Sequence, residues 1–435
     1  MVDLVVGAGL KAGVAKVDIT PLAGQPMYGF AARLSPAMGT LDPLFARVLV
    51  LEVGETRLAL VALDLGRSFG PAALARLQDD VKESSGISYV LVTASHTHSG
   101  PVIKDEYPPG KTPPWETLTL ERIAKAIDAA HEKAVEARIG TGYGVAYIGH
   151  NRLRVNPEGT VTWMDRNTAR IPTSPVDPTV SVLRVDTREG QPLAILVNYA
   201  CHPVVLGPDN VKFSADFPGT MTSTVEQAFD GQPVCFFLQG APGDINPYHA
   251  VTLLTQDALK WRDWTGERLG REAARVAGDI HTETNSEASL DVAEDVLIFR
   301  LRWQSEKFRE ALLGFGEAFF EDYAPAIREE WRLPVATVLL NQQIALMTMP
   351  GEPFVEFQMN WRDRCPVQDA FLLGYANGYY GYFPTIDVAA KGGYGGAGAT
   401  AWVEVGAGER MVDRALIRVY EMLGRLTDIP QNAEY

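Results

Sequence analysis

Two histidines spaced two residues apart, His96 and His98, close an apolar segment that begins at Tyr89. Side chains at positions i and i+2 of a β-strand point to the same face, so the two imidazoles are predicted to converge. Two imidazoles where a strand becomes a loop fit a metal site or an acid–base site, because loops on a rigid scaffold carry function. For the pair alone, an exposed polar turn is the favoured alternative.

Two more residues with ligand chemistry follow the same pattern. His202 comes directly after the apolar run 193–200, and Glu352 comes shortly after the run 335–347. Ligands of α/β sheets gather at strand ends, and two imidazoles with a carboxylate are donors that zinc prefers. With an open fourth position, zinc lowers the pKa of a bound water to roughly 7. The structural alternatives are a buried turn for His202 and a helix cap for Glu352.

The composition limits the classes of protein to consider. The chain has 435 residues, 46% of them apolar, which supports a globular fold, and its net charge is −15. This charge disfavours nucleic acid and anionic membranes as partners. No apolar run reaches the length of a membrane span, and the first residues lack the features of a signal peptide. Three scattered cysteines indicate a reducing compartment, so we expect a cytoplasmic protein.

Strand and helix patterns alternate along the chain, which predicts an α/β fold with a mixed β-sheet core flanked by helices. We expect a single large domain over residues 1–435, with a possible internal boundary at the polar connector 282–289. Strands are predicted at 12–21, 47–53, 57–64, 89–96, 140–151, 180–186, 193–200, 234–239, 291–303, 335–347 and 371–375. Helices are predicted at 71–84, 115–137, 217–229, 257–280 and 409–426. The Gly-rich segment 391–399 is expected to be a flexible lid or a wall of the substrate site.

Short motifs spread along the chain resemble, in order, the catalytic domain of the neutral (non-lysosomal) ceramidases, a family of zinc amidases. The most specific of them is His-Thr-His-Ser-Gly-Pro at 96–101. The others are Ala-Lys-Val-Asp-Ile-Thr at 15–20, Asn-Arg at 151–152, Asn-Tyr-Ala-Cys-His at 198–202, Ser-Ala-Asp at 214–216, Gly-Asp-Ile-Asn-Pro at 243–247, Pro-Gly-Glu at 350–352 and Gly-Tyr-Ala-Asn at 374–377.

The resemblance implies four zinc ligands, which are His96, His202, Glu352 and Tyr382. It also implies that His98 and Arg152 line the substrate site. Tyr394, twelve residues beyond Tyr382, matches a second family tyrosine at the scissile region. Residue types and spacing alone do not select Tyr382 from the tyrosines at 375, 379, 380 and 382.

A chemical role follows for each of these residues. Zinc would polarise the substrate carbonyl and deliver hydroxide, while His98 protonates the leaving group and Arg152, Tyr394 or Asn246 stabilises the oxyanion. Metal-bound imidazoles usually donate their other N–H to a carboxylate or carbonyl. Asp64 and Asp216 are our candidates for that second shell, and their alternative role is helix or turn capping.

Two departures from the ceramidase pattern affect the predicted substrate. Asn246 stands where the family carries a serine, and asparagine can donate a hydrogen bond but is not a nucleophile. The chain ends soon after its last predicted helix, so no C-terminal immunoglobulin-like domain is expected. Neither a basic patch nor an apolar hairpin for membrane docking is evident. We therefore expect a soluble substrate rather than ceramide.

The predicted function is a zinc-dependent hydrolase that cleaves a C–N amide, lactam or ester bond of a soluble small molecule with metal-activated water. The alternatives are a true ceramidase, another zinc-dependent reaction such as a lyase or phosphoester hydrolase, and a non-catalytic metal- or carbohydrate-binding module. The expected partner is a small-molecule substrate, with no nucleic acid and no stable membrane insertion. A homo-oligomer is compatible with the Trp261 and Trp264 pair, which fits a dimer contact or a core seam.

Overall fold

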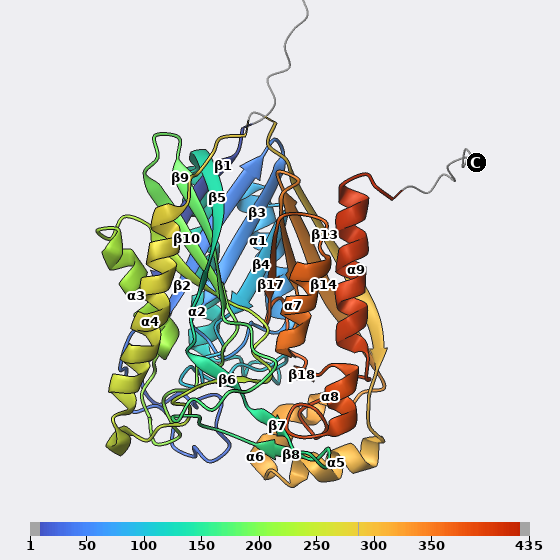
Figure 1. The fold of residues 1–435 in the computed structure, drawn as a ribbon. Helices are drawn as coiled ribbons and strands as arrows, with labels where there is room; N and C mark the ends of the chain where they lie inside the picture. The colour runs from blue at the N-terminus through green and yellow to red at the C-terminus, as the bar shows by residue number, and fades with distance from the viewer. Residues whose placement is uncertain (1–8, 286, 427–435) are drawn as a thin grey trace, which may run out of the picture.

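The computed structural model describes residues 9–285 and 287–426. Two β-sheets pack face to face, and helices cover the outer face of each sheet (Figure 1). This confirms the predicted α/β class with mixed sheets flanked by helices, and it divides the predicted core into two sheets.

The larger sheet has eight strands in the order β11-β10-β9-β5-β1-β2-β3-β4. Its pairs are antiparallel except β10 with β11 and β3 with β4. The strand bounds are β1 Lys11–Asp18, β2 Phe45–Val53, β3 Thr56–Leu63, β4 Tyr89–Ala94, β5 Val135–Val145, β9 Thr179–Thr187, β10 Pro192–Tyr199 and β11 Val234–Gln239. Strands such as β3 and β10 are buried on both faces, so long apolar runs form them.

The second sheet has the order β13-β14-β15-β17, with bounds Leu290–Arg300, Glu330–Leu340, Ile344–Thr348 and Asp369–Leu373. Alternate residues of each strand point to opposite faces. Leu49 and Leu60 of the larger sheet therefore share a buried cluster with Leu346 and Phe371 of the second sheet. This shared core fixes the two sheets against each other.

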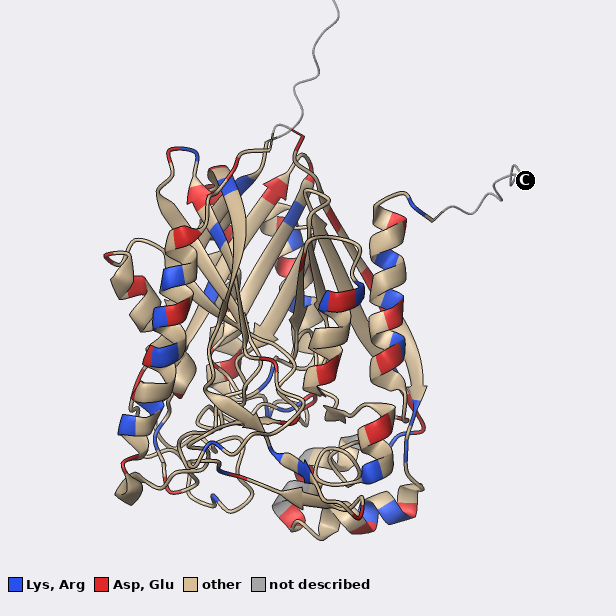
Figure 2. Cartoon of the chain, in the orientation of Figure 1, with Lys and Arg blue, Asp and Glu red and all other residues tan. Residues whose placement is uncertain are grey.

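Six helices cover the outer faces. On the larger sheet lie α1 Pro71–Ser85, α2 Pro114–Glu132, α3 Phe217–Ala228 and α4 Ala258–Asp279, and on the second sheet lie α7 Val355–Arg364 and α9 Ala407–Met422. Acidic and basic residues alternate along α4 and α9 in Figure 2, which is typical of solvated helix faces. Among the residues described, no helix combines the length and the apolar character needed to cross a membrane.

Short elements gather at the lower end of the molecule in Figure 1. They are β6 Gly149–Asn151, β7 Leu153–Val155, β8 Val161–Trp163, β12 Ile245–Pro247, β16 Glu352–Pro353 and β18 Tyr382–Phe383, with α5 Ser305–Leu313, α6 Glu317–Tyr323 and α8 Ile386–Lys391. The chain also contains two short 3-10 helices, η1 Leu254–Gln256 and η2 Ala324–Ala326. The candidate site lies among these elements.

Several sequence-based predictions of elements were wrong. The strand predicted over 140–151 falls in two strands, β5, which ends at Val145 in the larger sheet, and β6, which pairs with β12. The strand predicted over 89–96 ends at Ala94, so both His96 and His98 lie beyond it. The helix predicted over 115–137 ends at Glu132, and β5 starts at Val135. The single strand predicted at 335–347 is the β14–β15 hairpin, because Asn341 and Gln342 adopt left-handed φ angles of 54° and 56° and reverse the chain.

The polar connector 282–289, of which residue 286 is not described, leads from the larger sheet to the second sheet. The side chain of Thr282 donates to Asp186 in β9, and the backbone N–H of Ser289 donates to Asn341 beyond β14. The connector is therefore tied to both sheets.

Candidate metal centre and its cavity

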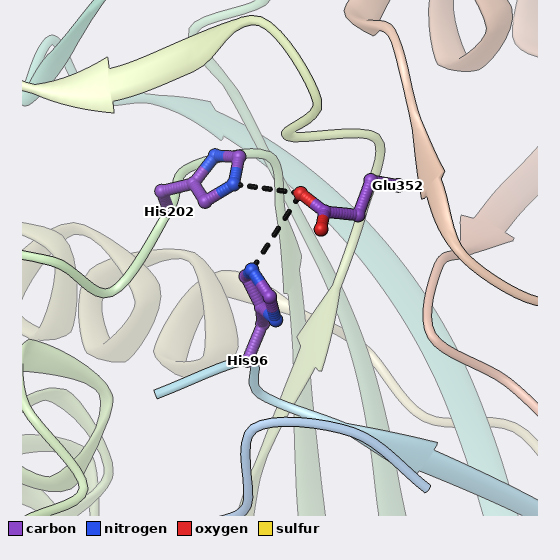
Figure 3. A group of neighbouring side chains, drawn as sticks. All are labelled: His96, His202 and Glu352. Carbon is purple, nitrogen blue, oxygen red and sulfur yellow. Dashed lines mark hydrogen bonds and ion pairs between the residues drawn. The ribbon is translucent and has the colours of Figure 1, made fainter. Parts of the chain in front are cut away.

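Three buried side chains from distant parts of the chain converge at the ends of strands. His96 follows β4, His202 follows β10 and Glu352 lies in β16, and one ligand atom from each falls within 4.8 Å of the others (Figure 3). His202 Nε2 lies 3.0 Å from Glu352 Oε2, and His96 Nε2 lies 3.6 Å from the same oxygen. The structure therefore brings together the three residues that strand ends and residue types pointed to.

Both imidazoles are oriented by backbone carbonyls. His96 Nδ1 lies 2.6 Å from the carbonyl oxygen of Gly66, and His202 Nδ1 lies 3.0 Å from that of Ile245. A carbonyl oxygen only accepts, so each Nδ1 carries the proton and each Nε2 presents a lone pair toward Glu352. Burial lowers the pKa of His96 to about 4 and lowers the pKa of His202, so both rings are neutral near pH 7.

Glu352 is ionised in this environment. Burial alone would raise its pKa, but the contacts with His96, His202 and Tyr379 hold its pKa below the usual range. The carboxylate and the two Nε2 atoms therefore meet in one buried pocket. A divalent cation satisfies all three acceptors, and this donor set suits zinc.

The turn at His96 is not a continuation of the strand. His96 has a φ of 70°, which lies in the left-handed region, and its ring stacks on Tyr375 at 4.1 Å between ring centres. His98 still reaches the cluster, with its Nε2 3.2 Å from His96 Nε2. The two imidazoles converge as predicted, but a strained loop brings them together, because β4 ends before His96.

Tyrosines complete the oxygen side of the cluster. The Tyr379 hydroxyl donates to Glu352 Oε1 at 2.5 Å, and Tyr382 pairs with Glu352 across the parallel β16–β18 bridge. Burial raises the pKa of Tyr382 well above its ordinary value, and the neighbouring Arg152 guanidinium acts in the opposite direction. Nothing in the sequence distinguishes Tyr379 from the adjacent tyrosines, so its contact with Glu352 emerges only in the structure.

Arg152 lies behind Tyr382 rather than in the cavity lining. Its Nη2 donates to the Tyr382 hydroxyl at 2.8 Å and to the Gly243 carbonyl at 2.7 Å, and its Nη1 donates to Asn246 Oδ1 at 3.1 Å. Its guanidinium also lies 4.5 Å from the ring centre of Trp163. In this geometry Arg152 fixes the position of the Tyr382 hydroxyl.

Asn246 faces away from the space where an oxyanion would form. Its Oδ1 accepts from Arg152, and its Nδ2 donates to the backbone carbonyl of Asp165 at 3.1 Å. The predicted role of Asn246 as an oxyanion donor therefore has no support in the geometry. Of the three predicted donors, Tyr394 alone lines the cavity. Its ring meets that of Tyr382 edge-on at 5.5 Å.

Asp64 and Asp216 do not orient the imidazoles, which corrects that prediction. Asp64 forms a buried ion pair with Arg47 at 2.7 Å. Asp216 accepts from the backbone N–H groups of Leu206 and Phe217 and caps α3, which is the alternative role that its position at a helix start allowed. Backbone carbonyls take the second-shell role instead, because the left-handed turn at His96 and the loop after β10 place them beside the rings.

The cluster opens into a cavity of about 610 Å³. His96, His98, Glu352, Tyr379 and Tyr382 lie at its base. Most of the remaining lining is apolar or aromatic, including Met27, Phe30, Leu34, Val102, Ile103, Phe315, Tyr323 and Trp402. A polar ligand cluster at the base of an apolar cavity can hold an uncharged chain beside a polar bond.

Comparisons with known proteins show the family of the chain. Residues 10–260 match the model of the neutral/alkaline non-lysosomal ceramidase family, N-terminal region. The chain belongs to the neutral/alkaline non-lysosomal ceramidase family, which confirms the resemblance seen in its motifs. This is a family of metal-dependent amide hydrolases, and the chain is thus a member of an enzyme family.

Particular relatives define how far the likeness extends. A neutral ceramidase of Mycobacterium tuberculosis is 25% identical over 265 residues, covering 55% of this chain and 40% of that relative's length. The crystal structure of neutral ceramidase from Pseudomonas aeruginosa has a TM-score of 0.73 at 17% identity and covers 98% of this chain and 76% of that chain. A ceramidase complexed with C2 matches at a TM-score of 0.72, 17% identity, and 98% and 77% coverage. At 17% identity, these structural matches show a shared fold.

Proposed function

We propose that the protein is a zinc-dependent amidohydrolase that cleaves the amide bond of N-acyl compounds with an apolar chain, as a ceramidase does. The observation that carries this proposal is the buried His96, His202 and Glu352 cluster at the base of an apolar cavity. Membership of the ceramidase family supports the amide as the bond that is cleaved.

His96, His202 and Glu352 would hold the zinc, with the Tyr382 hydroxyl beside Glu352 as the fourth ligand. Zinc bound there would supply a Lewis acid for the substrate carbonyl and lower the pKa of water to roughly 7. The chain itself keeps both imidazoles neutral and Glu352 ionised, which is the protonation state that a metal requires.

His98 is placed to move the proton of the reaction. It lines the cavity, and burial lowers its pKa well below the ordinary value, so it rests in the neutral form. A neutral imidazole accepts a proton from the attacking water and returns it to the amide nitrogen as the C–N bond breaks. The products are then a carboxylic acid and an amine, which exchange a proton to become a carboxylate and an ammonium ion. The Tyr394 hydroxyl, on a ring that packs edge-on against Tyr382 in the cavity lining, provides a donor for the carbonyl oxygen.

The cavity favours a lipid-like acyl compound over the soluble small molecule expected from sequence. Charged side chains are a minority of its lining, and the apolar lining would desolvate an acyl chain. Asn246 stands at the position where the family carries a serine. Its side chain contacts Arg152 and Asp165 and none of the metal ligands. N-acyl sphingoid lipids are therefore the substrate class that we place first.

The test combines metal analysis with a substrate panel. Purified protein should contain close to one zinc per chain, and chelation should abolish hydrolysis of a short-chain N-acyl sphingosine, with activity restored by zinc. His131→Ala is the matched control, since His131 lies on α2 and bonds Glu52 away from the cavity. Protein without stoichiometric metal, or cleavage of phosphoesters or esters with no amide cleavage, would refute the proposal.

A further inference from the structure

One loop forms a large part of the opening of the cavity. Residues 19–41, which we call the mouth loop, contribute Met27, Tyr28, Phe30 and Leu34 to the cavity lining. The two limbs of the loop are joined by backbone hydrogen bonds, from Gly24 N–H to the Ala37 carbonyl at 2.7 Å and from Ala37 N–H to the Gln25 carbonyl at 2.9 Å. The loop is therefore a built part of the fold.

The mouth loop carries the three most exposed large apolar side chains of the described residues. Leu34 is 88% exposed, Leu22 is 86% exposed and Met38 is 74% exposed, and no other such side chain exceeds 55%. Leu22 and Met38 lie next to the hydrogen-bonded rungs at Gly24 and Ala37, so they belong to the same part of the loop. Single exposed apolar residues need no explanation, but three on one loop at a cavity mouth do.

The loop also lacks negative charge. Asp and Glu make up about one residue in eight of the chain, 54 of 435, yet residues 19–41 contain none. Its single charged residue, Arg33, is 9% exposed and points inward. An acid-free, apolar surface on a chain of net charge −15 is suited to contact with a lipid surface, where carboxylates would be costly to desolvate.

Buried contacts hold the loop in place. Arg33 Nη1 donates to the Tyr28 carbonyl at 3.0 Å and to the His98 carbonyl at 2.6 Å. Gly29 has a φ of 107° and lies against His98, where an added Cβ would come within 2.4 Å of the ring. Leu22, Leu34 and Met38 therefore project from a fixed base, and little ordering is needed when they contact a partner.

We propose that the mouth loop docks the protein onto an uncharged or zwitterionic lipid surface, with Leu22, Leu34 and Met38 inserted among the acyl chains. The turn between α5 and α6 also reaches the cavity, through Phe315, which is 47% exposed, and through Glu317. Leu34 belongs to both the surface and the cavity, so an acyl chain can pass from lipid to cavity without crossing water.

A lipid surface fits the mouth loop better than a protein partner does. Two of the three exposed side chains are leucines, and Leu is under-represented among the side chains that carry most of the binding energy at protein interfaces, which are mainly Trp, Tyr and Arg. The substrate that the lipid presents rests on the proposed function, but the docking itself does not depend on catalysis.

The binding test is flotation of the purified protein with phosphatidylcholine vesicles. Inserting one Leu or Met side chain is worth roughly a tenfold change in partition or more. Leu22→Gln with Met38→Gln should therefore lower the partition coefficient at least about tenfold. Val135→Gln with Ile417→Gln is the matched control, because both residues are exposed and neither lines the cavity. Wild-type protein that does not float, or equal partition of both double variants, would overturn the proposal.

An activity assay adds a second readout. The Leu22 and Met38 double variant should keep kcat/KM for a monomeric short-chain N-acyl substrate within about twofold and lose at least about tenfold on N-acyl lipid embedded in vesicles. If gel filtration shows that the wild type is a dimer and the double variant is a monomer, the loop is a self-association surface and the proposal is wrong. If no amide is cleaved in either form, the proposed function fails while flotation still decides the docking.

Discussion

The two halves of the ligand cluster are held by different means. His96 and His202 follow strands of the larger sheet, and backbone carbonyls of Gly66 and Ile245 orient their rings. Glu352 and Tyr382 pair across short strands, and the side chains of Tyr379 and Arg152 orient their oxygens. We call these the histidine half and the oxygen half. A carbonyl cannot be removed by substitution, so the histidine half is fixed by the fold while the oxygen half depends on replaceable side chains.

This difference locates where the reactivity of the site can be tuned. Substitutions in the second shell change the oxygen half and leave the histidine half in place, because outer-shell side chains set the orientation and basicity of the ligands they contact. The most direct experiments first remove one ligand from each half. They then replace side chains that contact the ligands, and finally follow how stability depends on the protonation of the histidines.

The largest effect is expected when one ligand of either half is removed. His96→Ala and Glu352→Ala should each abolish stoichiometric zinc and all amidase activity, because three buried donors share one ion. Metal analysis after dialysis is the measurement, and the surface variant His131→Ala should retain full zinc. If Glu352→Ala kept its zinc, the oxygen half would not be part of the metal site.

His98→Ala tests whether the histidine half contains a third ligand. We expect retained zinc and a loss of turnover of roughly 10²–10⁴-fold, the usual range for a general acid–base group. The 3.2 Å distance between the Nε2 atoms of His98 and His96 also fits two ligands of one ion. Zinc content and kcat are measured on the same preparation. Loss of zinc would assign His98 to the ligands and remove it from proton transfer.

Arg152→Met should act through the oxygen half. Removal of the guanidinium frees the Tyr382 hydroxyl, so we expect a loss of about 10–100-fold in zinc affinity or activity. If Arg152 works through Tyr382, then Tyr382→Phe and the double variant should show strongly non-additive losses, measured by zinc titration. Additive losses would instead assign Arg152 a role of its own, such as contact with the substrate.

The smallest effect concerns the pH dependence of the metal-free protein. The folded pKa of His96 is lowered to about 4 and that of His202 is lowered, so between pH 6.5 and 4 the unfolded chain binds more protons than the folded chain. The free energy of unfolding should therefore fall as the pH drops through this window, by up to about 1.4 kcal/mol per pH unit for each histidine.

Two buried carboxyls oppose this trend. Burial raises the pKa values of Asp216 and Asp244 to about 6, so each stabilises the folded state as the pH falls toward 4. The measurement is therefore the difference in unfolding free energy between the wild type and a variant with His96→Gln and His202→Gln, since both proteins keep the carboxyls. A difference that does not change with pH would show that the two rings are not buried in the neutral form.

Much of the fold followed from local patterns. The β2–β3 hairpin, helices α1, α3 and α4, and strands β9, β10 and β11 lie close to their predicted ranges, because each has a continuous apolar or amphipathic pattern. The predicted bounds were wrong where an apolar or amphipathic pattern continues past the residue at which the strand or helix ends. The apolar run at 335–347 gives no sign of the left-handed residues that turn β14 into β15. The packing of two sheets on one core is also absent from any local pattern.

For the site, the sequence by itself determined the donor types and their location after apolar strands, since His96, His202 and Glu352 each follow such a run. Only the tertiary structure decided that the rings are held by carbonyls, that Tyr379 bonds Glu352, and that Asn246 faces Asp165. It also decided that Leu22, Leu34 and Met38 stay exposed. The physical reason is that periodicity encodes which face of one element is buried, whereas hydrogen-bond partners and exposure depend on other segments of the chain, tens of residues away in these cases.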